Sequence, residues 1–192
     1  MRLFIAFRLQ LAAEYNLLRS ELRRRTPYDT INWVADDLNH LTLRFIGKTP
    51  STQVRPIAEK LQTIAAHTPF LDLDINKLGV FGSHYAPKVI WLGIEKTPHL
   101  QQLYNEVDEA LQQLNFTLPK ENFVPHITLG RIKELDNKKR FWQTFEELQP
   151  EYHQHFHFTH LSLIRSQLEK NGPIYTTLYD FPLAAEQSSQ NV

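Results

Sequence analysis

Residues 40–47 read HLTLRFIG, and this stretch decides how the chain is expected to fold. His40 and Thr42 alternate with Leu41 and Leu43 before a glycine ends the run, which is the period-two pattern of a half-buried β-strand. Successive side chains of a strand point to opposite faces. The stretch therefore predicts a strand that presents an imidazole and a hydroxyl on one face and packs its leucines into a core on the other.

The pattern recurs later in the chain, where residues 126–130 read HITLG. His126 and Thr128 again share one face, and Ile127 and Leu129 share the core face. A helix-sized segment lies near each of the two strands. The chain is thus weakly duplicated, and this predicts two similar lobes that face each other.

The segments around these strands show strand and helix patterns in irregular order. Further strands are expected over 3–7, 70–75, 88–94, 156–164 and 175–181. Helices are expected over 11–25, 52–66, 98–114 and 139–148, and a glycine-containing, mobile connection over 79–87. Strands and helices do not alternate as they do in a doubly wound parallel sheet, so the fold class is α+β.

Composition limits the functions open to the chain. Its 192 residues, 42% hydrophobic, are enough for one domain, expected over 1–185, with a polar and disordered tail over 186–192. The 21 basic and 21 acidic residues balance, so a surface for non-specific binding of long nucleic acids is not expected. Without cysteine there is no disulfide, zinc-thiolate site or cysteine nucleophile. No signal peptide or membrane span is recognisable, which favours a cytoplasmic protein.

Two imidazoles and two hydroxyls that meet across a cleft suit one chemical problem. In-line cleavage of a phosphodiester needs a base for water, an acid for the leaving oxygen and hydrogen-bond donors at the equatorial oxygens. A single His-x-Thr unit on a strand is more often structural, because buried polar side chains are commonly hydrogen-bonded parts of the fold. Two matching copies favour catalysis. Residue physics alone leaves open which histidine is the acid.

With both motifs in place, the chain resembles the 2H phosphoesterase superfamily and, within it, the RNA 2′,3′-cyclic phosphodiesterases once called 2′-5′ RNA ligases. The likeness extends beyond the motifs to the opening RLFIA at 2–6, Asn39, FIG at 45–47, VIWLG at 89–93, Pro125 and Arg131. One departure is the absence of the proline that usually follows the first strand, where this chain has RLQL at 8–11. The resemblance implies a bilobal α+β fold with antiparallel sheets and flanking helices around a central cleft.

The resemblance also implies the roles of the site residues. His40 would donate a proton and His126 accept one, while Thr42, Thr128 and Arg131 would bind the phosphate. Arg131 has the wrong strand parity for this role unless Gly130 bends or bulges the strand. The implied reaction opens 2′,3′-cyclic phosphate ends of RNA to 2′-phosphomonoesters without metal, cofactor or protein partner, with weak 2′-5′ joining as its reverse.

Several alternatives stay open. Arg44 has the strand parity of His40 and could serve the phosphate or be solvated, and Trp33, Phe123 and Tyr175 could stack on a base or pack in the core. The histidines at 153, 155, 157 and 160 suggest a metal site or a polar edge strand. The substrate could instead be a 2′-5′ oligonucleotide or a cyclic phosphate of an ADP-ribose derivative, or the chain could only bind nucleotide ends.

Overall fold

The computed structural model describes residues 1–119, 122–150, 153–169 and 172–185. The tail at 186–192, expected to be disordered, lies outside these residues. Helices and strands of the described part follow one another irregularly. In chain order they are β1 (Arg2–Arg8), α1 (Ala13–Arg25), β2 (Thr30–Trp33), η1 (Asp36–Leu38), β3 (His40–Lys48), η2 (Ser51–Gln53), α2 (Val54–Ala65), β4 (Leu71–Ser83), β5 (Ala86–Ile94), α3 (Pro98–Gln113), β6 (His126–Glu134), α4 (Lys138–Glu147), β7 (His155–Phe158), β8 (His160–Glu169) and β9 (Gly172–Pro182).

The described strands form one antiparallel sheet in the order β7-β4-β5-β6-β3-β1-β8-β9, and the short β2 pairs with β6. β3 and β6 meet at the centre through a single backbone pair, Leu41 with Ile127. Outward from this junction the order is β3-β1-β8-β9 on one side and β6-β5-β4-β7 on the other. The predicted α+β class, with two facing lobes of antiparallel sheet, is confirmed.

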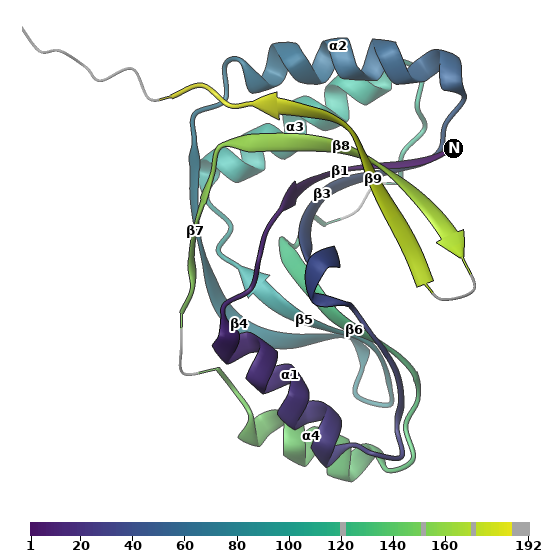
Figure 1. The fold of residues 1–192 in the computed structure, drawn as a ribbon, viewed down its shortest axis with the longest axis vertical. Helices are drawn as coiled ribbons and strands as arrows, with labels where there is room; N and C mark the ends of the chain where they lie inside the picture. Colours follow the sequence, from purple (N-terminus) through teal and green to yellow (C-terminus); the bar gives the residue numbers. More distant parts are fainter. Residues whose placement is uncertain (120–121, 151–152, 170–171, 186–192) are drawn as a thin grey trace, which may run out of the picture.

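Each half of the sheet is covered by a pair of helices (Figure 1). α2 packs against α3 on the half that contains β8 and β9, whereas α1 packs against α4 beside β4, β5 and β6. α1 follows β1 in the sequence, but it covers the half of the sheet that contains β6 and not the half that contains β1. In the part of the chain that the structure describes, no helix is long and apolar enough to cross a membrane.

Local sequence explains why α3 forms where it does. The Thr97 hydroxyl accepts a hydrogen bond from the Leu100 amide at 3.2 Å, and Pro98 occupies the first turn, where its missing N–H costs nothing. Leu103 and Val107 continue the apolar stripe and are buried. The helix therefore has one polar face and one face that packs on the sheet.

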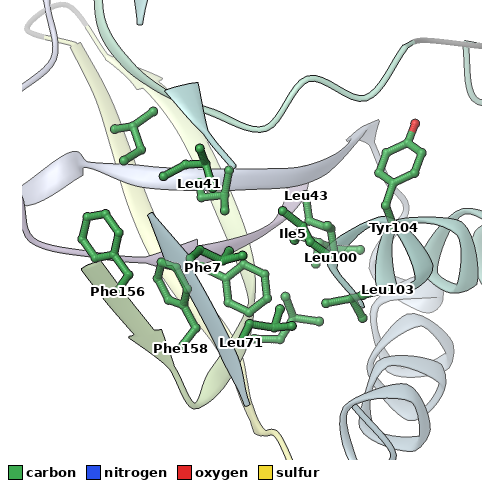
Figure 2. Packing of buried hydrophobic residues seen from close by; sticks show 14 of the residues in the cluster. Ile5, Phe7, Leu41, Leu43, Leu71, Leu100, Leu103, Tyr104, Phe156 and Phe158 are labelled. Atoms are coloured by element: carbon green, nitrogen blue, oxygen red, sulfur yellow. The ribbon is translucent and has the colours of Figure 1, made fainter. Parts of the chain in front are cut away.

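The core lies between the sheet and these helices (Figure 2). Leu41 and Leu43 project from β3 next to Ile5 and Phe7 of β1, and all four side chains are buried. Burial of one such side chain contributes about 1.5–3 kcal/mol to folding. The predicted split of β3 into a core face and a site face is thus built into its packing.

The connection expected over 79–87 is mostly strand. β4 continues through Gly79 to Ser83, and the hairpin turn is confined to His84 and Tyr85. Gly79 is needed because a Cβ there would lie 2.3 Å from the Trp91 ring of β5. This glycine marks a close approach of a neighbouring side chain inside a strand, and not the end of the strand.

The single strand expected over 156–164 is two strands. β7 pairs with β4 at one end of the sheet, whereas β8 lies between β1 and β9 in the other half, and the chain crosses over at Thr159. Because no glycine or proline marks the crossover, the apolar pattern runs through it without interruption. β2 was not expected at all, since its four residues are too few for a period-two signal.

Candidate active site

Both motifs lie on strands and show the predicted parity. His40 and Thr42 are half-buried on one face of β3, and Leu41 and Leu43 are buried on the other. β6 repeats this pattern of burial over 126–129. Each strand therefore carries its imidazole and its hydroxyl side by side, with a firm core behind them.

The central backbone pair brings the two motifs together. Because Leu41 is the partner of Ile127 in an antiparallel pairing, each histidine is aligned with the threonine of the other strand. The aligned pairs are His40 with Thr128 and His126 with Thr42. All four side chains lie on the face opposite to the two central apolar residues, about a local two-fold axis.

Both imidazoles are held in the same way. Nδ1 of His40 lies 2.7 Å from the carbonyl oxygen of Leu38, and Nδ1 of His126 lies 2.7 Å from the carbonyl oxygen of Val124. A carbonyl can only accept, so Nδ1 carries the proton in both rings. Nε2 of each ring is left to take up or release a proton, as an acid or a base requires.

The surroundings of both histidines favour the neutral form. Burial is the main cause that lowers the pKa of His40 and of His126 below the ordinary value, and the backbone hydrogen bond at Nδ1 opposes it in each. The positive charge of Arg131 lowers the pKa of both rings further. A bound phosphate would act in the opposite direction, since an anion stabilises imidazolium.

Aromatic side chains fix the planes of the two rings. The His40 ring contacts Phe4 at 5.1 Å between centroids and meets Tyr175 edge-on at 5.3 Å. The His126 ring meets Phe81 edge-on at 4.7 Å. Apolar walls of this kind exclude water from part of each ring, which is the physical cause of the lowered pKa values.

A β-bulge brings Arg131 to the site. In the pairing of β5 with β6, Thr128 and Gly130 face consecutive residues of β5, so that Leu129 is the extra residue. The bulge reverses the alternation, and Arg131 lies on the same face as Thr128. Its positive charge lowers the pKa of both histidines and opposes the burial that raises the pKa of Tyr175, so the charge of Arg131 acts on all three groups. The predicted conflict of parity is resolved by a bulge beside Gly130.

A matching bulge has the opposite effect on Arg44. Leu43 is one of two extra residues in the pairing of β1 with β3, and Arg44, which follows it, is turned from the site face to the core face. Its side chain is only 4% exposed, and Nε lies 2.9 Å from Oδ1 of Asp108 on α3. The expectation of a solvated arginine was wrong, because the bulge could not be read from the parity of the strand, whereas a role of Arg44 at the phosphate stays a prediction.

The three candidate aromatic side chains have different surroundings. Tyr175 stands against the His40 ring, Trp33 packs over Gly130, and Phe123 stacks on Tyr104 with 4.3 Å between ring centroids. Phe123 also lines a cavity of about 290 Å³ next to His126. The other residues that line this cavity are Thr42, Leu43, Arg44, Phe45, Phe81, Tyr104, Asn122, Val124 and His126.

The histidine-rich segment forms a polar edge strand. His155 donates from Nδ1 to Asp74 at 2.9 Å, and His157 donates from Nδ1 to Asp72 at 2.8 Å, across the pairing of β7 with β4. No carboxylate was expected near these histidines, because the two aspartates are distant in the sequence. Within the described ranges, no three histidine or carboxylate side chains are arranged to hold a metal ion.

The chain is similar to proteins of a known family. The family model of the 2′-5′ RNA ligase superfamily matches residues 12–170. The RNA 2′,3′-cyclic phosphodiesterase of Thermotoga maritima is 33% identical over 148 residues, which are 77% of this chain and 77% of the relative. That of Methanocaldococcus jannaschii is 27% identical over 181 residues, covering 94% and 100% of the two chains. The chain spans about half the length of the Geobacillus stearothermophilus relative, at 32% identity over 82% of this chain and 48% of that one.

Solved structures show the same fold. The crystal structure of TT0787 from Thermus thermophilus superposes with a TM-score of 0.79 at 22% identity, and covers 97% of this chain and 100% of its own. The complex of E. coli LigT with 3′-AMP superposes with a TM-score of 0.72 at 25% identity, over 95% and 98% of the two chains. From the family match, the identities and the duplicated motif, the chain belongs to the 2′-5′ RNA ligase superfamily.

Proposed function

We propose that the chain hydrolyses the 2′,3′-cyclic phosphodiester ends of RNA to 2′-phosphomonoesters, with His40 and His126 as the acid/base pair. The arrangement of two histidines and two threonines around the pair of Leu41 with Ile127 carries the proposal. The relatives named as RNA 2′,3′-cyclic phosphodiesterases support the choice of substrate. The E. coli LigT complex with 3′-AMP supports a nucleotide end as the ligand.

In the proposed reaction, Nε2 of His126 takes a proton from water as the water oxygen attacks phosphorus. The bond from phosphorus to the 3′ oxygen breaks in line with this attack, and Nε2 of His40 gives its proton to that oxygen. Nδ1–H of each ring stays on its backbone carbonyl throughout. One proton is taken and one is given, so the reaction balances, and the product carries a 2′-phosphate and a 3′-hydroxyl.

The hydroxyls of Thr42 and Thr128 would donate to the two equatorial oxygens of the phosphate. Each hydroxyl can rotate toward the oxygen on which charge develops. The guanidinium of Arg131 offers paired donors to the same oxygens and a positive charge that is always present. Every role in the cleavage is thus assigned to a side chain of this site, and the proposed reaction needs no cofactor and no second protein.

The same groups would act on an alcohol in place of water. If the 5′-hydroxyl of a second RNA end attacks phosphorus, His126 takes its proton, the bond from phosphorus to the 3′ oxygen breaks, and His40 protonates that oxygen, which leaves a 2′-5′ linkage. The cavity of about 290 Å³ beside His126 lies on the side where that alcohol would enter. It favours 2′-5′ oligonucleotides as a second substrate class, cleaved at the same phosphate position. We place this chemistry in the cytoplasm, on RNA ends left by cleavage.

One experiment tests the proposed function. A short RNA ending in a 2′,3′-cyclic phosphate is incubated with the protein, and the product is analysed by mass spectrometry and by comparison with authentic 2′- and 3′-phosphate standards before and after phosphatase digestion. We expect the mass of the RNA to rise by that of one water molecule, and we expect the product to end only in a 2′-phosphate. A 3′-phosphate product, or no turnover of any cyclic or 2′-5′ substrate by the intact motifs, would contradict the proposal.

A further inference from the structure

We propose that Arg19 and Arg44 are positioning residues, each of which fixes the short segment that precedes one catalytic histidine. Neither arginine lies on the site face of the sheet. Each is largely buried and makes hydrogen bonds to backbone carbonyl groups close to a histidine partner. The roles of His40 and His126 in this inference rest on the proposed function, whereas the positioning itself does not.

Arg44 ties three elements together behind the site. Its Nε lies 2.9 Å from Asp108 of α3, Nη1 donates to the hydroxyl of Tyr104 at 2.9 Å, and Nη2 donates to the carbonyl oxygen of Pro119 at 2.8 Å. A planar guanidinium satisfies these directions at once, which a lysine ammonium on a flexible stem cannot do equally well. Arg44 therefore joins β3, α3 and the chain that leads to β6.

This network reaches His126 through two aromatic rings. Tyr104, which is bonded to Arg44, stacks on Phe123 at an interplanar angle of 12°. Phe123 precedes Val124, and the carbonyl of Val124 accepts the Nδ1–H of His126 at 2.7 Å. Residues 122–125 are neither helix nor strand; the carbonyl of Pro125 accepts a backbone hydrogen bond from the Ile94 amide at 3.1 Å, and the stacking of Phe123 holds the residue on the other side of Val124.

Arg19 plays the corresponding part in front of the other motif. It extends from α1 with a side chain that is 12% exposed. Nη1 donates to the carbonyl oxygen of Val34 at 2.6 Å, and Nη2 forms an ion pair with Asp36 and bonds Asn16 at 3.1 Å. Burial lowers the pKa of Arg19, but a guanidinium stays charged at any physiological pH. The two contacts at 34 and 36 hold both sides of the turn that enters η1.

From this turn the network continues to His40. The amide of Leu38 donates to Ala35 at 3.0 Å, and the side-chain amide of Asn39 donates to the carbonyl of Asp36 at 2.9 Å. The carbonyl of Leu38 then accepts the Nδ1–H of His40 at 2.7 Å. A displaced turn would move this carbonyl, and the ring would lose the partner that fixes its tautomer.

Loss of one carbonyl should affect one histidine. The hydrogen bond at Nδ1 raises the pKa of its ring against burial, so its loss lowers that pKa further. Loss of this hydrogen bond also allows the neutral ring to carry its proton on Nε2, and a protonated Nε2 can no longer act as a base. Arg131 acts on both rings, Tyr175 contacts the His40 ring, and the charge of His126 lowers the pKa of His40; neither Arg131 nor Tyr175 belongs to the networks of Arg19 and Arg44 described above.

The test compares Arg19→Lys with Arg44→Lys, which keep the charge and remove the fork. The ring nitrogens of the free protein are followed by NMR through a pH titration, with Arg55→Lys as the control, since Arg55 is 85% exposed on α2. We expect Arg44→Lys to lower the pKa of His126 and to populate its Nε2–H tautomer. Arg19→Lys should do the same to His40 alone, and Arg55→Lys should change neither ring.

Kinetics supply a second readout. Each lysine variant should lower kcat by about tenfold or more with little change in KM, the scale of one hydrogen bond to a charged group. The two variants should shift opposite limbs of the pH profile, because they act on different histidines. If a variant only destabilises the fold, the molecules that remain folded should keep both limbs of the pH profile at the same pH as the unmodified protein.

Two milder variants keep the test decisive if a lysine variant does not fold. Tyr104→Phe removes one partner of Arg44, and Asp36→Asn weakens one partner of Arg19, while both arginines remain. Unchanged titration of both rings in all folded variants, or equal shifts of both rings in each, would overturn the inference. The NMR result does not depend on substrate, so it stands even if the proposed cyclic phosphodiesterase activity is refuted.

Discussion

Valine in place of either site threonine removes one hydroxyl and keeps the shape of the side chain. Thr42 and Thr128 are both half-buried on the site face, and each is aligned with the histidine of the other strand, so each substitution should remove one donor of the same kind. We expect kcat to fall by about 10²-fold for each, the scale of one lost oxyanion donor, or about 2.7 kcal/mol. KM should change little if the donors act mainly on the charge that develops in the transition state.

The double variant distinguishes two arrangements. If each hydroxyl serves a different equatorial oxygen, the two effects are independent and multiply to about 10⁴-fold. If both serve the same oxygen, the double variant should be little slower than either single one. The assay is steady-state kinetics on a dinucleotide with a 2′,3′-cyclic end, with Tm measured for each variant and Thr42→Ser and Thr128→Ser as controls that keep the hydroxyl. Near-normal rates in both valine variants would refute a role of the threonines in catalysis.

Four further predictions concern the rest of the site. Exhaustive dialysis against EDTA should leave the rate unchanged, and a rate that is lost and then restored by Zn²⁺ or Mn²⁺ would disprove the metal-free mechanism. The pH profile of kcat/KM should be bell-shaped with its maximum on the acid side of about 6.5, because burial lowers the pKa of both histidines in the free protein. The two limbs of the kcat profile should lie at higher pH, because the bound anion raises the pKa of both histidines in the complex. A substrate with a better leaving group at the 3′ position should rescue His40→Ala but not His126→Ala, and equal rescue of both would overturn the assignment of acid and base. Gly130→Ala should lower Tm and raise KM. The Cβ of the alanine would lie 2.9 Å from Cγ2 of Ile31 and strain the bulge that orients Arg131, at a cost of about 1–3 kcal/mol. An unchanged KM would show that Arg131 does not depend on this close packing.

The alternation of side chains within each motif was enough to predict the strands and the face on which His40 and His126 lie. Parity is a local property of the backbone and is enforced by the burial of Leu41 and Ile127. The alignment of one motif with the other was not predictable in the same way, since it depends on which strands become neighbours. Only the duplication of the pattern indicated that the two motifs would meet.

The fate of the two arginines shows where local sequence stops being informative. Arg44 has the right parity for the site but is buried against α3, whereas Arg131 has the wrong parity but lies on the site face of β6. Both reversals come from a bulge at the same place in the two motifs, at Leu43 and Leu129. A bulge is set by the register with the neighbouring strand, β1 or β5, which lies far away in the sequence.

Long-range pairing also explains the other differences. The crossover at Thr159 is invisible because the apolar residues on both sides belong to one sheet but to opposite halves of it. The exchange of α1 to the half that contains β6 likewise depends on contacts that no helical pattern contains. Asp108 belongs to α3, so its ion pair with Arg44 of β3 could not be inferred from spacing within either element.

The duplication supplies the chemistry, but a fully symmetrical site would bind a phosphodiester equally well in two orientations. The second residue after each of Leu43 and Leu129 breaks this symmetry: β6 has Arg131 there, and β3 has Phe45, which is 57% exposed beside the cavity near His126. A guanidinium binds phosphate oxygens and an aromatic ring cannot, so the two orientations differ in free energy. Under the proposed function, this difference would let the two matching histidines take different roles, because the substrate would meet a cation beside one motif and an apolar surface beside the other.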